Sequence, residues 1–209
     1  MSNAGYKHIV LANGLFPSSE QVQNLLKRAE SIVCCDGAAL KLLEFGIEPQ
    51  YIIGDLDSLP DELKQKFAQK IIRIDCQETN DLTKAVEFCA TNNWKQIAIL
   101  GATGLREDHT LGNISLLGYY KNLIDEVVMI SDFGLFTPIL KSTAFVSFPG
   151  QQVSVFSLIP ETRLTFKGLK FPVTNMAFKY WWQATLNSSL DYSFEIILHN
   201  EGEVIVFTS

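Results

Sequence analysis

Short apolar runs alternate with helical patterns over the first two-thirds of the 209-residue chain. The apolar runs occupy residues 9–11, 32–35, 51–53, 71–74, 97–100 and 127–130. Between them, helical spacing of apolar residues occurs at 22–29, through Leu40 and Leu43, over 60–70, at 82–89 and over 109–120. Near-continuous apolar strands that alternate with helices predict an α/β fold, with a Rossmann-like, mostly parallel sheet that is covered by helices on both faces.

The sequence changes character after Pro138. Strand-like segments follow at 143–148, 152–158, 163–166, 194–198 and 204–207, and turn residues such as Gly150, Gly168 and Gly202 separate them. We therefore expect two domains, an α/β domain at 5–136 and an all-β sandwich at 137–209, with the boundary near residues 134–142.

The composition is that of an ordinary soluble chain, with 47% hydrophobic and 19% charged residues. A net charge of −6 argues against non-specific binding to nucleic acid. No apolar stretch approaches the ~20 residues of a membrane span. The N-terminus lacks the layout of a secretion signal, and Ser2-Asn3-Ala4 is typical of a remnant of tag removal.

The cysteines form no C-x-x-C pair, and Cys34-Cys35 lies inside a strand-like run, with Cys76 and Cys89 elsewhere. Buried free thiols in a reducing compartment fit this pattern. We therefore expect a cytoplasmic protein with no nucleic-acid or membrane partner.

Two aspartates stand in the segment Gly54-Asp55-Leu56-Asp57-Ser58, directly after the apolar run at 51–53. If the backbone stays extended, the side chains of Asp55 and Asp57 point the same way. Two unpaired carboxylates held close together repel each other, which costs free energy, and a divalent cation such as Mg²⁺ removes that repulsion. An acidic turn after a strand is the alternative, but the neighbouring motifs favour the metal site.

Further acids follow other strands of the predicted sheet. Asp36 ends the run at 32–35, Asp75 ends the run at 71–74, and Asn80 or Asp81 is placed to cap the next helix. In open parallel sheets, ligands bind beyond the carboxyl ends of the strands. We therefore expect these acids to meet at one edge of the sheet.

The segment Gly101-Ala102-Thr103-Gly104 follows the run at 97–100 and suits a phosphate site, because glycines let main-chain N–H groups approach an anion closely. It lacks the Gly-Lys-Ser/Thr of a Walker P-loop, and an ordinary strand-to-helix turn is the alternative. Arg106 is placed either to neutralise phosphate charge or to remain a solvated surface arginine.

Asp108-His109 follows at the start of a helix, with Asn113 about a turn later. A neutral His109 would hydrogen-bond to Asp108 or to a substrate, and a purely structural role is the alternative. Zinc is a poor fit, because no second histidine or cysteine lies at ligand spacing.

Four stretches of the chain form a joint pattern that is more specific than any one of them. They are Cys35-Asp36-Gly37-Ala38, Gly54-Asp55-Leu56-Asp57-Ser58, Asn80-Asp81-Leu82-Thr83-Lys84, and Gly101-Ala102-Thr103-Gly104-Leu105-Arg106-Glu107-Asp108-His109-Thr110-Leu111-Gly112-Asn113. In this order and spacing they resemble the thiamin pyrophosphokinase family. The resemblance covers nearly the whole chain, since that family also pairs an α/β domain with a β-sandwich.

The resemblance implies transfer of pyrophosphate from ATP to the hydroxyl of thiamin, with thiamin diphosphate and AMP as products. It implies Mg²⁺ on Asp55, Asp57 and Asp81, and a homodimer that binds thiamin between the α/β domain of one subunit and the sandwich of the other. The residues implied in catalysis are Asp55, Asp57, Asp81, Arg106 and Asp108. Those implied in binding ATP or thiamin are Asp36, Gly37, Asn80, Lys84, Thr103, Gly104, Arg106, His109, Asn113, Asn187 and Ser188.

The chain departs from the family pattern at several positions. Asn80 replaces the usual threonine, Leu105 interrupts the second glycine pair, and Leu186 replaces a serine, so that Asn187 or Ser188 would have to supply that contact. The aromatic residues considered for stacking on thiamin are Trp181, Trp182 and Phe207, although a place in the sandwich core or dimer interface is favoured for them. Asp57 and Asp81 are both candidates for accepting the hydroxyl proton.

Two alternative functions stay open. The first is a related pyrophosphokinase for another hydroxymethyl heterocycle, such as a pterin. The second is a non-catalytic sensor of nucleotide or thiamin. The retained aspartates argue against the sensor, because binding alone does not need so many groups that can hold a metal.

Overall fold

The computed structural model describes residues 5–209, so the Ser2-Asn3-Ala4 segment lies outside the described residues. These residues divide into two compact units. The α/β unit comprises residues 5–116 and Asn122–Asp132, and the β unit comprises Leu117–Lys121 and Phe133–Ser209. Every helix within residues 5–209 is too short or too polar to span a lipid bilayer.

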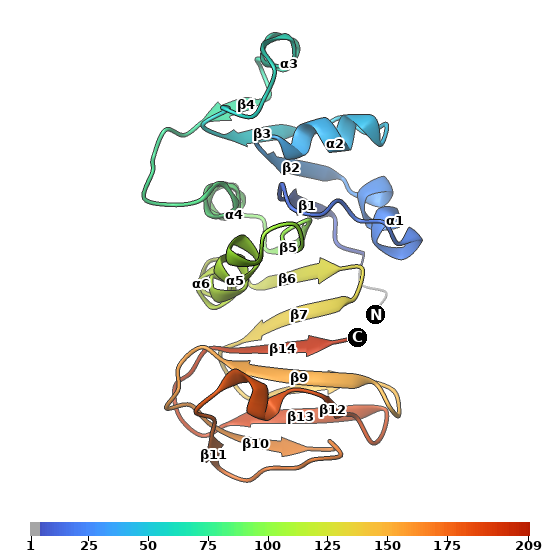
Figure 1. The fold of residues 1–209 in the computed structure, drawn as a ribbon, viewed down its shortest axis with the longest axis vertical. Coiled ribbons are helices and arrows are strands. Elements are labelled where there is room, and N and C mark those ends of the chain that lie inside the picture. Colours follow the sequence, from blue (N-terminus) through green and yellow to red (C-terminus); the bar gives the residue numbers. More distant parts are fainter. Residues whose placement is uncertain (1–4) are drawn as a thin grey trace. The chain divides into compact units, whose positions relative to one another are not determined.

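The α/β unit is built on parallel strands, as the sequence predicts. In spatial order they are β6 (Glu126–Ser131), β5 (Gln96–Leu100), β1 (His8–Leu11), β2 (Ser31–Cys35), β3 (Tyr51–Gly54) and β4 (Ile71–Arg73). Figure 1 shows them one beneath another, from β4 at the top to β6. The central strands β1, β2 and β5 bury nearly all of their side chains. For this reason their sequences are almost continuously apolar.

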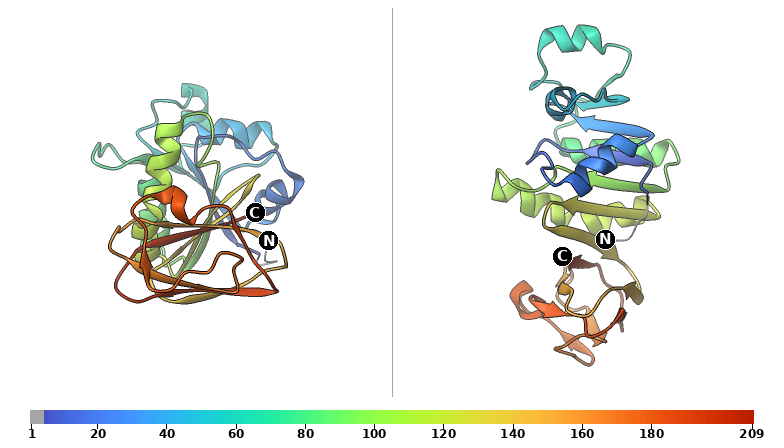
Figure 2. Two further views of the ribbon diagram at one scale, coloured as in Figure 1. Left: turned by 60° about the horizontal axis from the view of Figure 1, so that its bottom comes forward. Right: turned by 90° about the vertical axis from the view of Figure 1, so that its right-hand side faces the viewer.

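Helices cover both faces of this sheet (Figures 1 and 2). Helices α1 (Glu20–Arg28) and α2 (Ala38–Glu44) lie on one face, and α4 (Asp81–Thr91) and α5 (Glu107–Ser115) lie on the other. The chain builds β1 to β4 outward in one direction and then returns through α4 to place β5 on the opposite side of β1. Since such crossovers are right-handed, the helices change face at this point. The switch point of the sheet therefore lies between β1 and β5, and the predicted α/β fold is confirmed.

The ends of three helices carry local capping signals, and the predicted cap of α4 is one of them. The Asn80 side chain accepts a hydrogen bond of 2.8 Å from the Thr83 N–H and caps α4. The Ser19 hydroxyl accepts from the Val22 N–H at 3.4 Å and caps α1. Gly46, with a φ of +88°, ends α2 in the left-handed conformation that glycine adopts freely.

Two helical predictions differ from the structure. The helix expected over 109–120 is divided into α5 and α6 (Leu117–Leu123), a division that accords with the weak helix propensity of Gly112 and Gly118. The helix expected over 60–70 is only α3 (Asp61–Lys66). It stops at Phe67, whose ring is buried and lies under the Lys66 ammonium.

The β unit contains two antiparallel sheets. One consists of β12 (Asn187–Ser188), β9 (Gln152–Ser157), β14 (Val204–Thr208) and β7 (Gly134–Ile139). The other consists of β11 (Met176–Ala177), β10 (Arg163–Lys167), β13 (Ser193–Leu198) and β8 (Thr143–Val146). Both contribute to one apolar core, which includes Val155 and Val206 from the first sheet and Phe166 and Ile196 from the second. The expected β-sandwich is confirmed.

Strand β7 was not predicted, because Pro138 lacks an N–H and argues against a strand. In the structure Pro138 lies opposite Ile205 of β14. The sequence also did not predict the short strands β11 and β12 or the 3-10 turn Trp181–Ala184. Segments of two to four residues are too short to show a periodic pattern.

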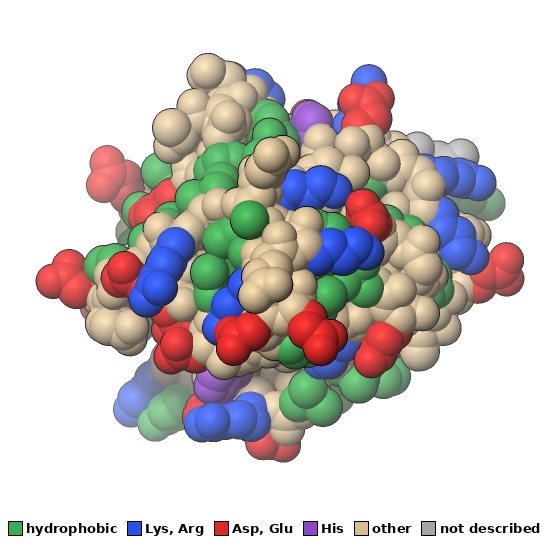
Figure 3. All heavy atoms as spheres, turned by 90° about the horizontal axis from the view of Figure 1, so that it is seen from above, with side chains coloured by type: hydrophobic (Ala, Val, Ile, Leu, Met, Phe, Trp, Pro, Cys, Tyr) green, Lys and Arg blue, Asp and Glu red, His purple; other side chains and the backbone are tan. Residues whose placement is uncertain are grey.

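Acidic and basic side chains are mixed on the face that carries α3 and β4 (Figure 3). In this region the Glu48 carboxylate pairs with the ammonium groups of Lys66 and Lys70, at 3.3 Å each. Exposed pairs of this kind contribute only about 0–1 kcal/mol, so the buried sheet and not its charged rim carries the stability.

The loops after β1 and β5 are tied together by their main chains. The Gly14 N–H donates to the Gly101 carbonyl at 2.7 Å, and the Leu15 N–H donates to the Thr103 carbonyl at 2.9 Å. A Cβ atom on Gly14 would lie 2.4 Å from the Gly101 oxygen, and one on Gly101 would lie 2.6 Å from the Ala12 oxygen. Glycine is therefore required wherever these two backbones approach each other.

We predict that Gly14→Ala lowers the free energy of unfolding by about 1–3 kcal/mol, because the backbone atoms that a new Cβ would meet cannot move aside cheaply. Gly112→Ala is the matched control: a Cβ there meets nothing within 4 Å and lies inside a helix, where alanine is favoured over glycine by up to about 1 kcal/mol. Urea denaturation compares the two variants, and equal stabilities would contradict the close-approach explanation.

Candidate active site

A cavity of about 430 Å³ opens at the carboxyl ends of the parallel strands. All of its walls belong to the α/β unit, and they come from the loops after β1, β2, β3, β4 and β5 and from the first turns of α4 and α5. The lining residues are Ala12, Asn13, Gly14, Cys35, Asp36, Asp55, Ser58, Gln77, Thr79, Asn80, Asp81, Leu82, Lys84, Ala102, Gly104, Leu105, Arg106, His109 and Asn113. The cavity thus lies at the switch point, where an open α/β sheet binds its ligands.

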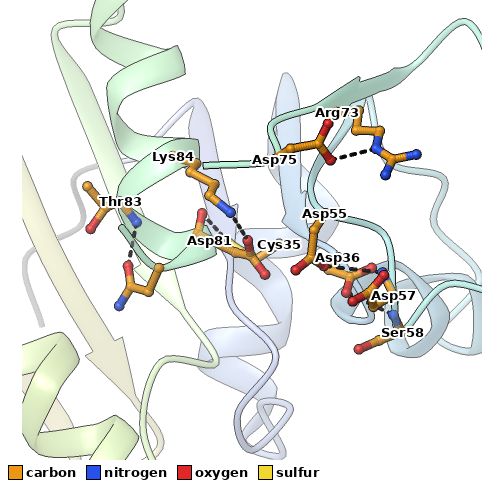
Figure 4. A network of polar contacts seen from close by, with 11 residues as sticks. Cys35, Asp36, Asp55, Asp57, Ser58, Arg73, Asp75, Asp81, Thr83 and Lys84 are labelled. Atoms are coloured by element: carbon orange, nitrogen blue, oxygen red, sulfur yellow. Dashed lines mark hydrogen bonds and ion pairs between the residues drawn. The ribbon is translucent and has the colours of Figure 1, made fainter. Parts of the chain in front are cut away.

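Three carboxylates meet in this cavity. One oxygen each from Asp36, Asp55 and Asp81 lies within 4.8 Å of the others, and Figure 4 shows the three side chains together. They arrive from the loop after β2, the loop after β3 and the start of α4. Gly54 makes room for them, since a Cβ there would lie 3.0 Å from the Asp36 Cβ and 3.2 Å from the Asp81 Cγ.

Asp36 is the most buried member of this carboxylate cluster, with 5% of its surface exposed. Its Oδ2 accepts from the Ser58 N–H at 3.0 Å, but its buried Oδ1 has no hydrogen-bond partner within residues 5–209. Burial raises the pKa of Asp36, against the lowering effect of the Ser58 hydrogen bond, and the charges of Asp81 and Asp55 raise it further. An unpaired buried carboxylate oxygen beside two other acids is the chemistry of a cation site.

Lys84 supplies part of the positive charge that the three carboxylates need. Its side chain is 4% exposed, and its Nζ lies 3.0 Å from the Asp81 Oδ1. A single ammonium cannot balance three ionised carboxylates, so an excess of negative charge remains in the cluster. A divalent cation would balance that excess.

Asp57 lies outside the carboxylate cluster, because the chain does not stay extended after Asp55. The Asp55 Oδ1 accepts from the Asp57 N–H at 3.2 Å, and Leu56 adopts a left-handed φ of +68°. Such an aspartate-centred turn competes with the extended backbone that the sequence suggested. Asp75 is also outside the cluster, and its carboxylate pairs with Arg73 at 2.7 Å (Figure 4). The expectation that all of these acids meet therefore holds only for Asp36, Asp55 and Asp81.

The glycine-rich loop after β5 reaches the cavity through Ala102, Gly104, Leu105 and Arg106. Thr103 is absent from the lining, and its carbonyl oxygen accepts from the Leu15 N–H instead. Its predicted role in binding the nucleotide stays a prediction.

Arg106 is held in place by Asp108. The Arg106 Nε donates to one oxygen of Asp108 at 3.1 Å and the Nη2 donates to the other at 2.5 Å. This bidentate contact lowers the pKa of Asp108 to about 2, so that Asp108 stays anionic at neutral pH. Asp108 does not line the cavity, and through this contact it orients a guanidinium that does.

A chain of amide contacts joins α4, α5 and the loop after β5. The Asn80 Nδ2 donates to the Asn113 Oδ1 at 3.3 Å, and the Asn113 Nδ2 donates to the Ala102 carbonyl at 2.8 Å. His109 also lines the cavity, and its main-chain N–H, rather than its imidazole, donates to Asp108.

Several lining residues were not identified from the sequence. Asn13 and Gly14 follow β1, the strand beside the switch point, and Gln77 and Thr79 precede the cap of α4. The position of β1 in the sheet, which no local motif reveals, places its loop in the site. Gly37, predicted to contact the nucleotide, does not line the cavity, and a Cβ there would lie 2.7 Å from the Asn13 Nδ2.

Asn187 and Ser188 belong to the β unit, in strand β12. The Asn187 Oδ1 accepts from the Phe171 N–H at 2.9 Å, and its Nδ2 donates to the Phe171 carbonyl at 2.8 Å. The buried amide thus joins strand β12 to the main chain at Phe171. The Trp181 indole donates to the Ser157 carbonyl at 3.0 Å, whereas Trp182 is 72% exposed.

The chain is similar to known proteins in both sequence and fold. Residues 22–129 match the family model described as thiamin pyrophosphokinase, catalytic domain, and residues 134–207 match thiamin pyrophosphokinase, substrate-binding domain. The chain belongs to the thiamin pyrophosphokinase family.

The individual relatives share less than a third of the aligned residues with this chain. Thiamine pyrophosphokinase 1 of Oryza sativa is 31% identical over 133 residues, which cover 52% of this chain and 50% of that protein. Thiamine pyrophosphokinase of Bacillus subtilis is 29% identical over 185 residues, which cover 80% of this chain and 78% of that protein. The chain thus spans about half the length of the rice protein that it matches.

Solved structures share the whole fold. The thiamin pyrophosphokinase of Geobacillus thermodenitrificans superposes with a TM-score of 0.78 at 24% identity, covering 97% of this chain and 96% of that one. The yeast thiamin pyrophosphokinase superposes with a TM-score of 0.76 at 18% identity, covering 100% of this chain and 88% of that one. At these identities the likeness establishes the fold alone.

We predict that Asp36→Asn raises the free energy of unfolding at pH 7 in the presence of a chelator. The raised pKa of Asp36 means that its ionised form is disfavoured in the folded state, so the wild type is destabilised above that pKa and recovers stability as the pH falls through it. Asparagine keeps an acceptor for the Ser58 N–H and tolerates the φ of +40° at this position.

The same variant should lose stabilisation by Mg²⁺. A cation at 100 times its Kd stabilises a folded protein by about 2.7 kcal/mol, and this gain should appear in the wild type but not in Asp36→Asn. Asp61→Asn, which changes an exposed acid in α3, is the control that should behave like the wild type. Equal Mg²⁺ responses in all three proteins would exclude Asp36 from the cation site.

Proposed function

We propose that the chain is an enzyme that transfers the pyrophosphoryl group of ATP to the hydroxyl of thiamin, giving thiamin diphosphate and AMP. The observation that carries the proposal is the carboxylate cluster of Asp36, Asp55 and Asp81, with its unpaired buried oxygen, opposite a glycine-rich loop in one cavity. Family membership supports the same reaction.

The donor set fits Mg²⁺, because carboxylate oxygens are the ligands that this ion prefers in proteins. Asp55 and Asp81, two of the ligands expected from the sequence, belong to the cluster, and Asp36 takes the third place in it. We assign these three to the cation, and Asp57 stays a predicted ligand. When bound, Mg²⁺ would neutralise charge on the triphosphate.

Other residues of the cavity would hold the phosphates in position. The main chain at Gly104 can approach an anion closely, and Arg106 and Lys84 contribute positive charge. The asparagines Asn80 and Asn113 fix the loop after β5 relative to α4. This arrangement suits a reaction in which positioning and charge neutralisation do most of the work.

In the reaction, the thiamin hydroxyl oxygen would form a bond to the β-phosphorus, and the bond between that phosphorus and the oxygen of the departing AMP would break. A carboxylate must accept the hydroxyl proton. Asp81 already pairs with Lys84, whereas Asp57 lies outside the cluster, so Asp57 has the less engaged carboxylate. Both stay candidates for the base.

Thiamin binding and assembly are also proposals. The exposed aromatic side chains of the β unit, among them Phe171, Tyr180 and Trp182, suit a surface that is covered by a second copy of the chain. We propose a homodimer in the cytoplasm, where the free thiols of all four cysteines would remain reduced. Static light scattering at working concentration should therefore report twice the mass of 23.4 kDa, and a clean monomer would contradict the dimer.

We predict that Asp55→Asn and Asp81→Asn each reduce turnover by about 10²–10³-fold, because each removes charge that holds the cation and the triphosphate. AMP and thiamin diphosphate formation with Mg²⁺, ATP and thiamin is the measurement. Asp61→Asn should keep the wild-type rate, and near-normal rates in the Asp55 or Asp81 variant would remove that residue from the site.

The alternatives are separated by the same assay. A hydroxymethyl pterin in place of thiamin tests the related pyrophosphokinase, which would form AMP with the pterin and not with thiamin. A protein that binds ATP and thiamin but forms no AMP with either acceptor would be the sensor.

A further inference from the structure

Leu105 is an unusual residue in the wall of the cavity. It adopts a φ of +64°, in the left-handed region where a bulky side chain is an outlier. Of the two leucines that line the cavity, Leu82 is 3% exposed but Leu105 is 66% exposed. The strained backbone is therefore not offset by burial of the side chain in the protein itself.

Leu105 has an apolar neighbour on a wall that mixes polar and apolar surface. Leu15, also an exposed leucine, packs against Gly104, where a Cβ would lie 2.8 Å from the Leu15 Cβ. The main chains of the two loops are joined by the hydrogen bond from Leu15 to Thr103. Two exposed leucines thus flank the glycine at the end of the phosphate-type loop.

We propose that Leu105 is a specificity-determining residue that packs its side chain against the purine ring of the bound nucleotide. The proposal rests on the proposed function, because it takes ATP as the phosphoryl donor. Strained residues cluster at ligand sites, where the strain is part of the function, and an exposed apolar side chain in the wall of a cavity suits a planar, apolar ligand face.

The purine fits this place better than thiamin does. The triphosphate would lie between the carboxylate cluster and the Gly101–Gly104 loop, so the remainder of the same molecule has to leave the cavity beside that loop. Leu105 directly follows Gly104, so its side chain lies beside the end of the loop where the rest of the nucleotide would emerge.

The test is a calorimetric titration of two ligands in the presence of Mg²⁺. One ligand is α,β-methylene ATP, which cannot be cleaved at the reacting position, and the other is inorganic tripolyphosphate, which lacks the base and ribose. The variants are Leu105→Gly and Leu105→Asn, both of which accept a left-handed backbone. Leu111→Ala, which removes an exposed leucine of α5 outside the cavity lining, is the control.

We expect both Leu105 variants to bind the methylene ATP about tenfold more weakly, as loss of an apolar side chain from a contact predicts, and to bind tripolyphosphate as the wild type does. The control should bind both ligands unchanged. Equal losses for the two ligands would show that Leu105 acts through the shape of the loop, and no loss for either would remove it from the site; either result overturns the proposal.

A selective loss of thiamin binding, measured in the same way, would also overturn it by placing Leu105 against the other substrate. These titrations need no turnover, so they stay informative if the AMP-formation assay fails. That assay alone decides the proposed reaction.

Discussion

Mutual repulsion among three carboxylates is the constraint around which the α/β unit is arranged. Asp36, Asp55 and Asp81 come from three separate stretches of chain, and the fold brings them within 4.8 Å of one another with one buried ammonium beside them. Gly54 is part of the same arrangement, because only the absence of its side chain lets Asp36 and Asp81 approach. The unpaired Oδ1 of Asp36 shows that the protein alone does not satisfy this cluster.

The topology explains why the cluster faces a glycine-rich loop. Strand order reverses between β1 and β5, so the loops after these two strands diverge toward opposite faces and leave a crevice. Main-chain hydrogen bonds from Gly14 and Leu15 fix the width of that crevice near its base. Acids from one side and main-chain donors from the other then face the same space, which is the layout that a chelated triphosphate requires.

The sequence allowed most of the fold to be predicted, since buried strands such as β1 and β5 are continuous apolar runs and α4 carries an explicit cap at Asn80. It also indicated the three clustered acids. It could not place Asp57, because the same residues suit an extended strand and an aspartate turn, and the left-handed φ of Leu56 belongs to the turn. Strand β7 was hidden by Pro138, and the contribution of the loop after β1 depends on which strands are neighbours, a long-range property without a local signal.

Backbone strain is distributed unevenly over the described chain, and its distribution bears on function. Among residues 5–209, six residues other than glycine have a positive φ, and Asp36, Leu56 and Leu105 are in or beside the cavity. Asn93 and Asn175 adopt the same conformation elsewhere, with the side chain that tolerates it best, and Leu186 of the β unit adopts it with its side chain 78% exposed. A leucine in this conformation costs about 1–2 kcal/mol, which glycine would avoid. Leu56 recovers that cost by burial, at 7% exposure, whereas Leu105 does not. Leu186 combines the same strain with exposure, so strain alone does not mark a binding site. Leu105 differs because it lines the cavity, where a bound ligand would supply the contact that the chain does not.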